Sequence, residues 1–191
     1  MRARAEATEE TRRRILQAAF DLTWDMVLLE ITLDGVADRA GVSVQTVLRH
    51  FSSREGLFDA VEAFASQIVS EERAAPSGGV DAAVSALFNH YELRGDAVMR
   101  MLGQELWDER IRRLADHGRR GHRQWVERAF ATQLDAASAG DREALVDLLV
   151  VATDVYTWKL LRRDRVLRRG VAEQRVRDLI AAVLMTAPEV G

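Results

Sequence analysis

The stretch that decides the fold is Thr32 to Phe51, which reads TLDGVADRAGVSVQTVLRHF. A helix-turn-helix needs a small residue where its two helices cross, a glycine in the turn, and apolar residues on both inner faces. Ala37 supplies the small residue, Gly41 the turn, and the apolar positions are Val36, Ala40, Val42 and Val47. The pattern predicts one helix after an N-cap at Thr32 and a second from Ser43 to Phe51. A helical hairpin with no DNA role satisfies the same packing pattern.

The outward face of the second helix favours a DNA-binding surface. The side chains on this face can donate hydrogen bonds to phosphates or base edges, and the N-terminus of the helix favours an anion. The side chains are those of Ser43, Gln45, Thr46, Arg49 and His50. No acidic residue occurs from Gly41 through Arg54, although the chain contains 30 of them. A carboxylate there would repel the DNA backbone. Arg54 opposes the dipole of the helix it starts but is well placed to reach a phosphate.

Helices are also expected on both sides of this motif. Thr8 is a candidate N-cap for a helix that runs to about Val27. Ser52 and Glu55 fit a capping box that starts a helix reaching about Arg73. The breaker cluster at 74–79, AAPSGG, then separates this N-terminal part from the remainder.

The remainder of the chain is read as helices alone. Only two prolines occur in the whole sequence, strand signals are essentially missing, and apolar periodicity predicts helices near 80–93, 96–109, 111–137, 141–163 and 172–186. The expected fold is all-α, with an N-terminal three-helix helix-turn-helix domain and a larger C-terminal helical domain for ligand binding and dimerisation. We predict a DNA-binding domain at 1–54 and an effector-binding and dimerisation domain at 55–191, with the helix at 55–74 connecting them.

Composition narrows the class of protein. The net charge of −3 argues against coating nucleic acid through bulk positive charge, so any DNA contact must be local. The absence of cysteine excludes disulfides and thiolate metal sites, and we expect no cofactor and no metal. The charged N-terminus lacks a secretory signal, and no apolar run is long enough to cross a bilayer. A cytoplasmic protein that does not contact the membrane is expected.

Three linked segments resemble the N-terminal signature of the TetR family of repressors. They are TRRRILQAA at 11–19, TLDGVADRAGVS at 32–43 and FSSREGL at 51–57. The resemblance covers about residues 8–64, and the rest of the chain is similar only in helical content and length. It implies an all-helical homodimer that binds double-stranded DNA at a near-palindromic operator. It also implies a variable C-terminal domain that binds a small effector, which alters the separation of the two reading heads.

The resemblance assigns roles to single positions in this sequence. It implies DNA backbone contacts from Ser43, Thr46, Arg49, His50 and Arg54, and base contacts from Val44 and Gln45. Thr32 and Leu48 complete the predicted DNA-binding set.

Three departures from the family pattern motivate an alternative function. Val44 replaces a residue that is frequently polar, Leu48 replaces a common phosphate-binding tyrosine, and Asp34 falls where a basic or polar side chain often approaches DNA. The alternative is a helical ligand-binding or partner-binding protein with a degenerate helix-turn-helix.

The C-terminal half offers an apolar pocket with a few polar groups as the effector site. The candidate lining residues are Phe88, Tyr91, Met99, Leu102, Trp107, Trp125, Asp154 and Trp158. Ordinary core packing is the competing interpretation, because aromatic and methionine residues at helical spacing usually pack. The last two long helices carry wide apolar stripes that predict a homodimer interface, and intrachain packing is again the alternative.

Enzyme functions find little support in the sequence. It contains no HExxH, no phosphate-binding glycine loop and no serine elbow. His117 and His122 are five residues apart, which puts them on different faces of a helix instead of stacking them as metal ligands. An all-helical enzyme rests only on the pocket-like aromatic residues, so we predict that the protein is not an enzyme.

Overall fold

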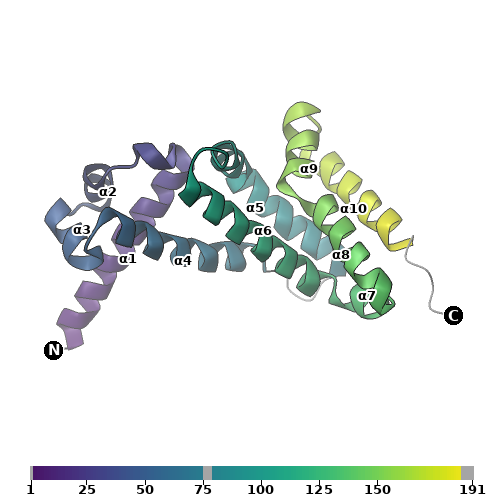
Figure 1. The fold of residues 1–191 in the computed structure, drawn as a ribbon, viewed down its shortest axis with the longest axis horizontal. Helices are drawn as coiled ribbons and strands as arrows, with labels where there is room; N and C mark the ends of the chain where they lie inside the picture. The colour runs from purple at the N-terminus through teal and green to yellow at the C-terminus, as the bar shows by residue number, and fades with distance from the viewer. Residues whose placement is uncertain (1, 75–78, 186–191) are drawn as a thin grey trace. The chain divides into compact units, whose positions relative to one another are not determined.

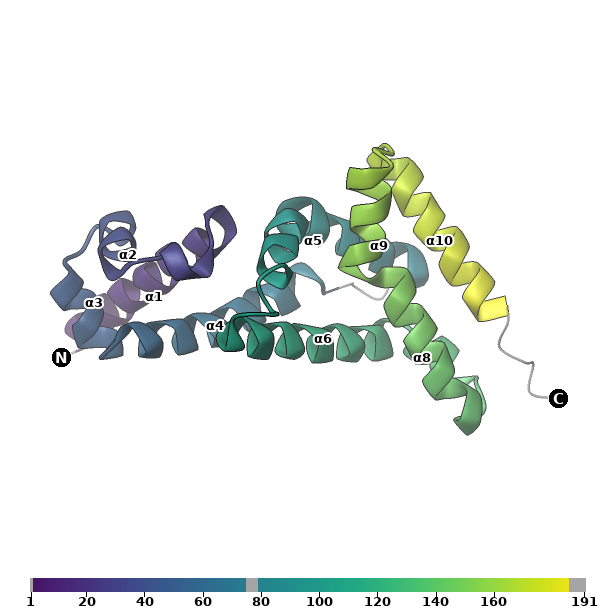
Figure 2. The ribbon, with the colours of Figure 1, turned by 45° about the horizontal axis from the view of Figure 1, so that its top comes forward.

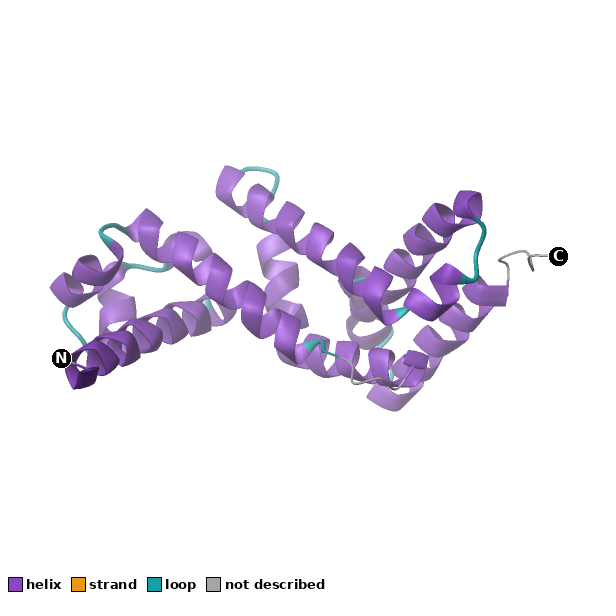
Figure 3. Ribbon diagram, turned by 90° about the horizontal axis from the view of Figure 1, so that it is seen from below, coloured by secondary structure: helices purple, strands orange, loops and turns teal. Residues whose placement is uncertain are grey.

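The computed structural model describes residues 2–74 and 79–185, and every regular element within those ranges is a helix (Figures 1 and 3). The predicted all-α class is confirmed. The chain divides into two compact units, Met1–Glu71 and Glu72–Gly191. This division reflects packing, so the functional boundary at residue 54 stays a prediction. No helix in the described ranges is long and apolar enough to cross a membrane.

The first unit surrounds one apolar core. Its elements are α1 (Arg2–Asp25), the 3-10 turn η1 (Leu28–Glu30), α2 (Leu33–Ala40), α3 (Val44–Phe51) and α4 (Arg54–Glu72). Ile15 and Phe20 of α1, Val36 of α2, Val47 of α3 and Leu57 of α4 are buried together. The helix-turn-helix of α2 and α3 is therefore held on α1 and α4 as one packed body.

Two predicted helix starts in this unit are wrong. Helix α1 begins at Arg2, and the Thr8 hydroxyl donates to the Arg4 carbonyl from inside the helix instead of capping it. It ends at Asp25, close to the predicted Val27. The start of α4 is capped by Ser53, whose hydroxyl accepts from the Gly56 N–H at 3.0 Å, while Ser52 lies in the turn with φ of 66°.

The second unit is a bundle with a large aromatic and aliphatic core. Its elements are α5 (Gly79–Leu102), α6 (Glu109–Ala129), α7 (Ala131–Asp135), α8 (Ala139–Thr153), α9 (Val155–Lys159), the π-helical turn η2 (Leu160–Asp164) and α10 (Arg169–Met185). Figure 2 shows α8, α9 and α10 in succession, and α10 packs against both α8 and α5. Phe88, Trp125, Phe130, Leu149 and Trp158 lie in this core.

The predicted helix boundaries in this unit need three corrections. No break occurs between 93 and 96, because α5 continues through Gly95, and the predicted helix at 96–109 is the end of α5 followed by a turn. The predicted helix at 111–137 is interrupted at Phe130. The predicted helix at 141–163 is interrupted at Asp154, whose carboxylate accepts from the Tyr156 N–H and starts α9. The predicted break at 74–79 falls mainly on residues 75–78, outside the described residues.

Candidate DNA-binding site

The turn between α2 and α3 has the geometry that its glycine predicted. Gly41 adopts φ of 65° and ψ of 42°, the left-handed conformation that favours glycine. Its N–H donates to the Ala37 and Asp38 carbonyls, and the Val42 N–H donates to the Ala37 carbonyl at 3.0 Å. At the other end of α2, the Thr32 hydroxyl accepts from the Gly35 N–H at 3.1 Å, so the predicted N-cap is confirmed.

Two hydroxyls lie at the N-terminus of α3. The Ser43 hydroxyl accepts from the Thr46 N–H at 3.2 Å and lies 3.0 Å from the Thr46 hydroxyl, which confirms Ser43 as the N-cap. A hydroxyl has one donor and two acceptor sites, so this pair retains capacity to bind a phosphate. The capping bonds also keep the N-terminus of α3 in a fixed conformation.

One face of α3 is buried and the opposite face is exposed, as a helix that binds in the DNA major groove requires. Val47 and Phe51 are buried, as predicted, and Val44 is half-buried against the same core. The apolar side chain of Val44 therefore contributes to the packing of this core. The Gln45, Leu48 and Arg49 side chains are exposed, and His50 is half-buried. Among the exposed site residues of α3, Gln45 and Arg49 carry the longest polar side chains.

The charge on α3 is available to a partner. Arg49 and His50 form no ion pair with any other residue of 2–74 or 79–185. Asp34 is exposed in the first turn of α2, and Asp38, also exposed, lies closer to α3 in the sequence. An unpaired guanidinium on an exposed helix suits a phosphate backbone.

Arg54 has a structural role that the sequence did not reveal. Its guanidinium donates to the Leu28 carbonyl at 3.1 Å and the Ile31 carbonyl at 3.2 Å, and it lies 4.8 Å from the centre of the Phe58 ring. These bonds hold the glycine-free segment between α1 and α2. A phosphate contact by Arg54 stays a prediction. Such a contact has to use guanidinium N–H groups that do not already donate to the Leu28 and Ile31 carbonyls.

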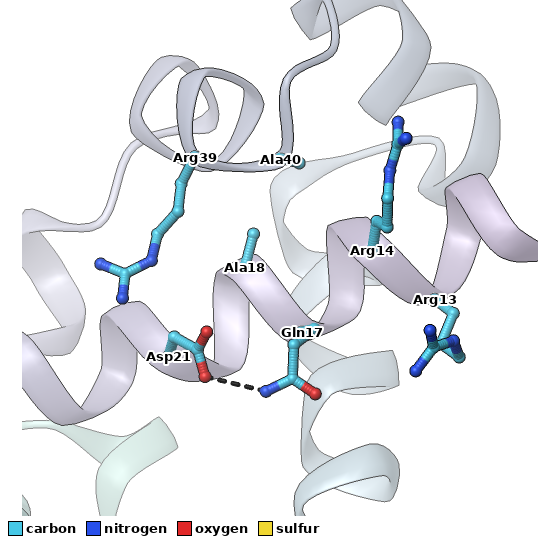
Figure 4. A pocket seen from close by; sticks show the side chains of 7 residues that line it. All are labelled: Arg13, Arg14, Gln17, Ala18, Asp21, Arg39 and Ala40. Carbon is cyan, nitrogen blue, oxygen red and sulfur yellow. Dashed lines mark hydrogen bonds between the residues drawn. The ribbon is translucent and has the colours of Figure 1, made fainter.

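A surface pocket of about 290 Å³ lies between α1 and α2 (Figure 4). It is lined by Arg13, Arg14, Gln17, Ala18, Asp21, Arg39 and Ala40. Gln17 donates to Asp21 at 2.8 Å, and Arg39 donates to Asp25 at 2.7 Å, so part of its polar lining is satisfied internally. None of the predicted DNA-binding residues lines it.

The predicted effector-pocket residues differ in how deeply they are buried. Phe88, Tyr91, Trp125 and Trp158 are buried in the core of the second unit, and Met99 and Leu102 are half-buried against it. Trp107 is 76% exposed in the turn after α5. A pocket role for these residues stays a prediction, and for Trp107 it would need a covering partner.

The structure also brings together a buried polar cluster that includes two of the predicted residues. Arg73, His122 and Thr153 are buried beside Tyr91 and Trp125, and we call these five residues the Arg73 cluster. Arg73 was not predicted as a site residue, because an arginine is usually exposed and nothing in the neighbouring sequence indicates that this one is buried.

The two buried histidines near Arg73 predict a specific dependence of stability on pH. Burial, reinforced by Arg73, lowers the pKa of His122 to about 3, and burial also lowers the pKa of His90. His122 stays neutral in the folded chain, and His90 takes up a proton less readily there than in the unfolded chain, where histidines bind protons near pH 6.5. The free energy of unfolding should therefore be constant above about pH 7 and fall between pH 6.5 and 4.5, by up to about 1.4 kcal/mol per pH unit for each proton.

Urea unfolding at successive pH values measures this effect, with His122→Gln as the test variant. The variant should lose part of the slope between pH 6.5 and 4.5, and His117→Gln, at an exposed position, should keep it. Glu72 contributes little to the pH dependence of the free energy of unfolding between pH 6.5 and 4.5. Its burial raises its pKa, but bonds from His90 and Arg94 lower it overall to about 2, so its stabilisation is lost only below pH 4.5. Equal slopes in both variants would contradict the role of His122.

The fold and the motif together define a class of protein. A glycine turn, a capped second helix with one buried face, and an unpaired arginine on its exposed face form a helix-turn-helix that can enter a DNA major groove. Residues 15–61 match the family described as bacterial regulatory proteins of the tetR family. This match and the helix-turn-helix geometry support a TetR-family regulator.

Solved structures extend the likeness of the fold over nearly the whole chain. A TetR-family transcriptional regulator from Streptomyces coelicolor has a TM-score of 0.68 at 20% identity, covering 96% of this chain and 92% of its own. A transcriptional regulator from Rhodococcus sp. Rha1 has a TM-score of 0.67 at 18% identity, covering 94% and 99%. No curated protein matches the sequence. Regulators of the TetR family bind DNA, dimerise and are not enzymes.

Proposed function

We propose that this regulator is a sequence-specific repressor, released from a near-palindromic operator by a small, largely apolar effector. The observation that supports it best is α3, in which buried Val47 and Phe51 fix one face while Gln45 and Arg49 stay exposed on the other. Such a helix keeps its reading side chains in place without help from DNA. Repression in this form also implies a location in the cytoplasm, with the genome.

The proposed contacts follow from where each side chain lies. Ser43, Thr46, Arg49 and His50 would bind the DNA backbone, and Gln45 would bind base edges through its amide, which pairs well with adenine. Val44 is half-buried, so it offers at most an edge of its side chain to a thymine methyl group. Thr32 and Leu48 are exposed beside this surface. Specificity would then depend on Gln45 and on the spacing of two half-sites.

The proposed dimer interface is the exposed apolar face of α8 and α10. On α8, Leu148 and Val151 are 47% and 63% exposed, although both are large and apolar. On α10, Leu179 and Met185 are exposed in the same way. A second copy that covers this face would form a four-helix interface and place two α3 helices on one operator.

The Arg49→Ala variant tests the DNA contact. A dimer would lose one phosphate contact per subunit, so affinity for the selected operator should fall on the order of tenfold, and the salt dependence should lose about two units of slope. Fluorescence anisotropy at several salt concentrations measures both, on an operator selected from genomic fragments. Arg113→Ala on α6 removes an exposed arginine elsewhere and should leave both unchanged.

The alternative is a ligand-binding or partner-binding protein whose helix-turn-helix no longer reads DNA. Exposed Asp34 and Leu48 favour it, because a carboxylate repels phosphate and leucine lacks a hydroxyl. It predicts that selection returns no common site and that binding, if any, ignores sequence. Recovery of one near-palindromic site, bound by the ligand-free protein, would exclude it.

A further inference from the structure

Arg73 is a buried cation that forms no ion pair within the described part of the chain. The residue is only 8% exposed, and its Nε atom has no hydrogen-bond partner. No carboxylate of residues 2–74 or 79–185 forms an ion pair with it. Proteins rarely bury an arginine in this way, since a buried charge is unfavourable unless it is paired and hydrogen-bonded.

The groups that touch Arg73 are neutral. Its Nη2 donates to Nδ1 of His122, so the other ring nitrogen of His122 carries the hydrogen. That nitrogen lies 3.2 Å from the Thr153 hydroxyl, which itself donates to the Leu149 carbonyl at 2.7 Å. This directed chain leaves His122 uncharged. The guanidinium also lies 4.7 Å from the centre of the Trp125 ring and 6.0 Å from that of Tyr91.

The acidic residues around the Arg73 cluster are already engaged. Glu72 accepts from Nδ1 of His90 and from Arg94, both at 2.8 Å. Asp154 caps α9 through the Tyr156 N–H at 2.8 Å. The negative charge of Asp154 favours the charged form of Arg73, whereas the positive charge of Arg128 opposes it. Both carboxylates are therefore committed to other hydrogen bonds, and neither pairs directly with the Arg73 guanidinium.

We propose that Arg73 binds the carboxylate of the effector, and that the effector is a small organic acid whose apolar body packs against the aromatic side chains of the cluster. A carboxylate is the simplest partner for a guanidinium, because it accepts two parallel N–H bonds, here including the free Nε–H. The aromatic rings of Tyr91 and Trp125 beside the guanidinium suit an apolar body. This inference rests on the proposed effector response for its biological meaning, whereas the preference for a carboxylate can be measured without DNA.

Paired ligands that differ only in charge test the proposal. Benzoate, phenylacetate and octanoate would be compared with benzamide, phenylacetamide and octanamide on the full chain without DNA, by isothermal titration and thermal unfolding. At least one acid should bind at least tenfold more tightly than its amide and raise Tm. Arg73→Met should abolish this preference, and Arg113→Met, which removes an exposed arginine, should keep it.

The outcomes separate this inference from the proposed function. If no acid outperforms its amide on the wild-type chain, Arg73 does not bind carboxylates, and that comparison holds even if Arg73→Met fails to fold. Equal preference in Arg73→Met and wild type would also overturn the assignment. Operator binding is measured separately on ligand-free protein, so an acid that binds a chain without an operator supports the Arg73 site and contradicts the repressor.

Discussion

Replacement of Gly95 by valine is expected to destabilise the C-terminal unit severely. Gly95 is buried in the middle of α5, and a Cβ atom there would lie 2.4 Å from Cζ3, 2.5 Å from Cη2 and 2.9 Å from Cε3 of Trp158. Real side chains do not approach this closely. Either the indole or the backbone of α5 must move, and a packed core resists both.

Trp158 has little freedom to give way. The residue is 1% exposed, its Nε1 donates to Glu92 at 3.0 Å, and the guanidinium of Arg163 lies 4.4 Å from its ring centre. Overpacking of this kind typically costs about 1–3 kcal/mol, and we expect Gly95→Val at or above the upper end, with Gly95→Ala below it. For a chain of this size, about 3 kcal/mol corresponds to a fall in Tm of roughly 6–12 °C.

Thermal and urea unfolding of the ligand-free chain measure the effect. Gly118→Ala on α6 is the matched control, because nothing lies within 4 Å of a Cβ atom at that position. Alanine favours a helix over glycine by about 1 kcal/mol, so the control should be neutral or stabilising. If Gly95→Val were as stable as Gly118→Ala, the close packing of Trp158 on α5 would be wrong.

Gly95 also shows why the helix boundaries of the second unit were hard to predict. A glycine inside a helical pattern suggests a helix break, and a break was predicted between 93 and 96. The glycine is present because an indole 63 positions later needs the space of its missing side chain. The reason for Gly95 is therefore a long-range contact, which no local window contains.

The helix-turn-helix was predictable for the opposite reason. Its determinants act within four residues along the chain: the cap at Ser43 reaches Thr46, Gly41 closes on Ala37, and Val47 with Phe51 forms one stripe. The Arg73 cluster depends on residues far apart, since Arg73 and His122 are separated by 49 positions. Arginine burial of that kind is set by packing between helices, so the sequence could not mark it.

The apolar stripes of the last two long helices were predicted only in outline. Leu145 and Leu149 of α8 and Ile180 of α10 are buried within the chain, whereas Leu148 and Leu179 are exposed. Their periodicity in the sequence places all of them on a wide apolar surface. It does not indicate which part of that surface packs within the chain and which part is exposed. The structure separates the two parts, and only the exposed part is available to a partner.

Charging that exposed face is expected to separate the dimer and to abolish operator binding. The variant is Leu148→Glu with Val151→Glu, two residues three positions apart on one face of α8. In a twofold interface each subunit contributes the same patch, so four carboxylates would be brought together in a desolvated contact. Burying unpaired charges is strongly unfavourable, whereas in a monomer these positions remain in water at little cost.

The loss of the dimer should reduce operator affinity about 100-fold or more. Two linked DNA-binding domains bind an operator far more tightly than one, because the second domain binds its half-site at high effective concentration. Arg49 and Gln45 are unchanged in the variant, so a monomer should still bind DNA weakly, with about half the salt dependence of the dimer.

Sedimentation and fluorescence anisotropy test the two consequences together, and circular dichroism shows whether the variant is folded. Leu93→Glu on α5 is the control, because this leucine is 65% exposed but lies outside the proposed interface. It should remain a dimer and keep its affinity for the operator. A double variant that stays dimeric would place the interface elsewhere on the second unit. A folded monomer with undiminished affinity would instead show that one reading head is sufficient for operator binding.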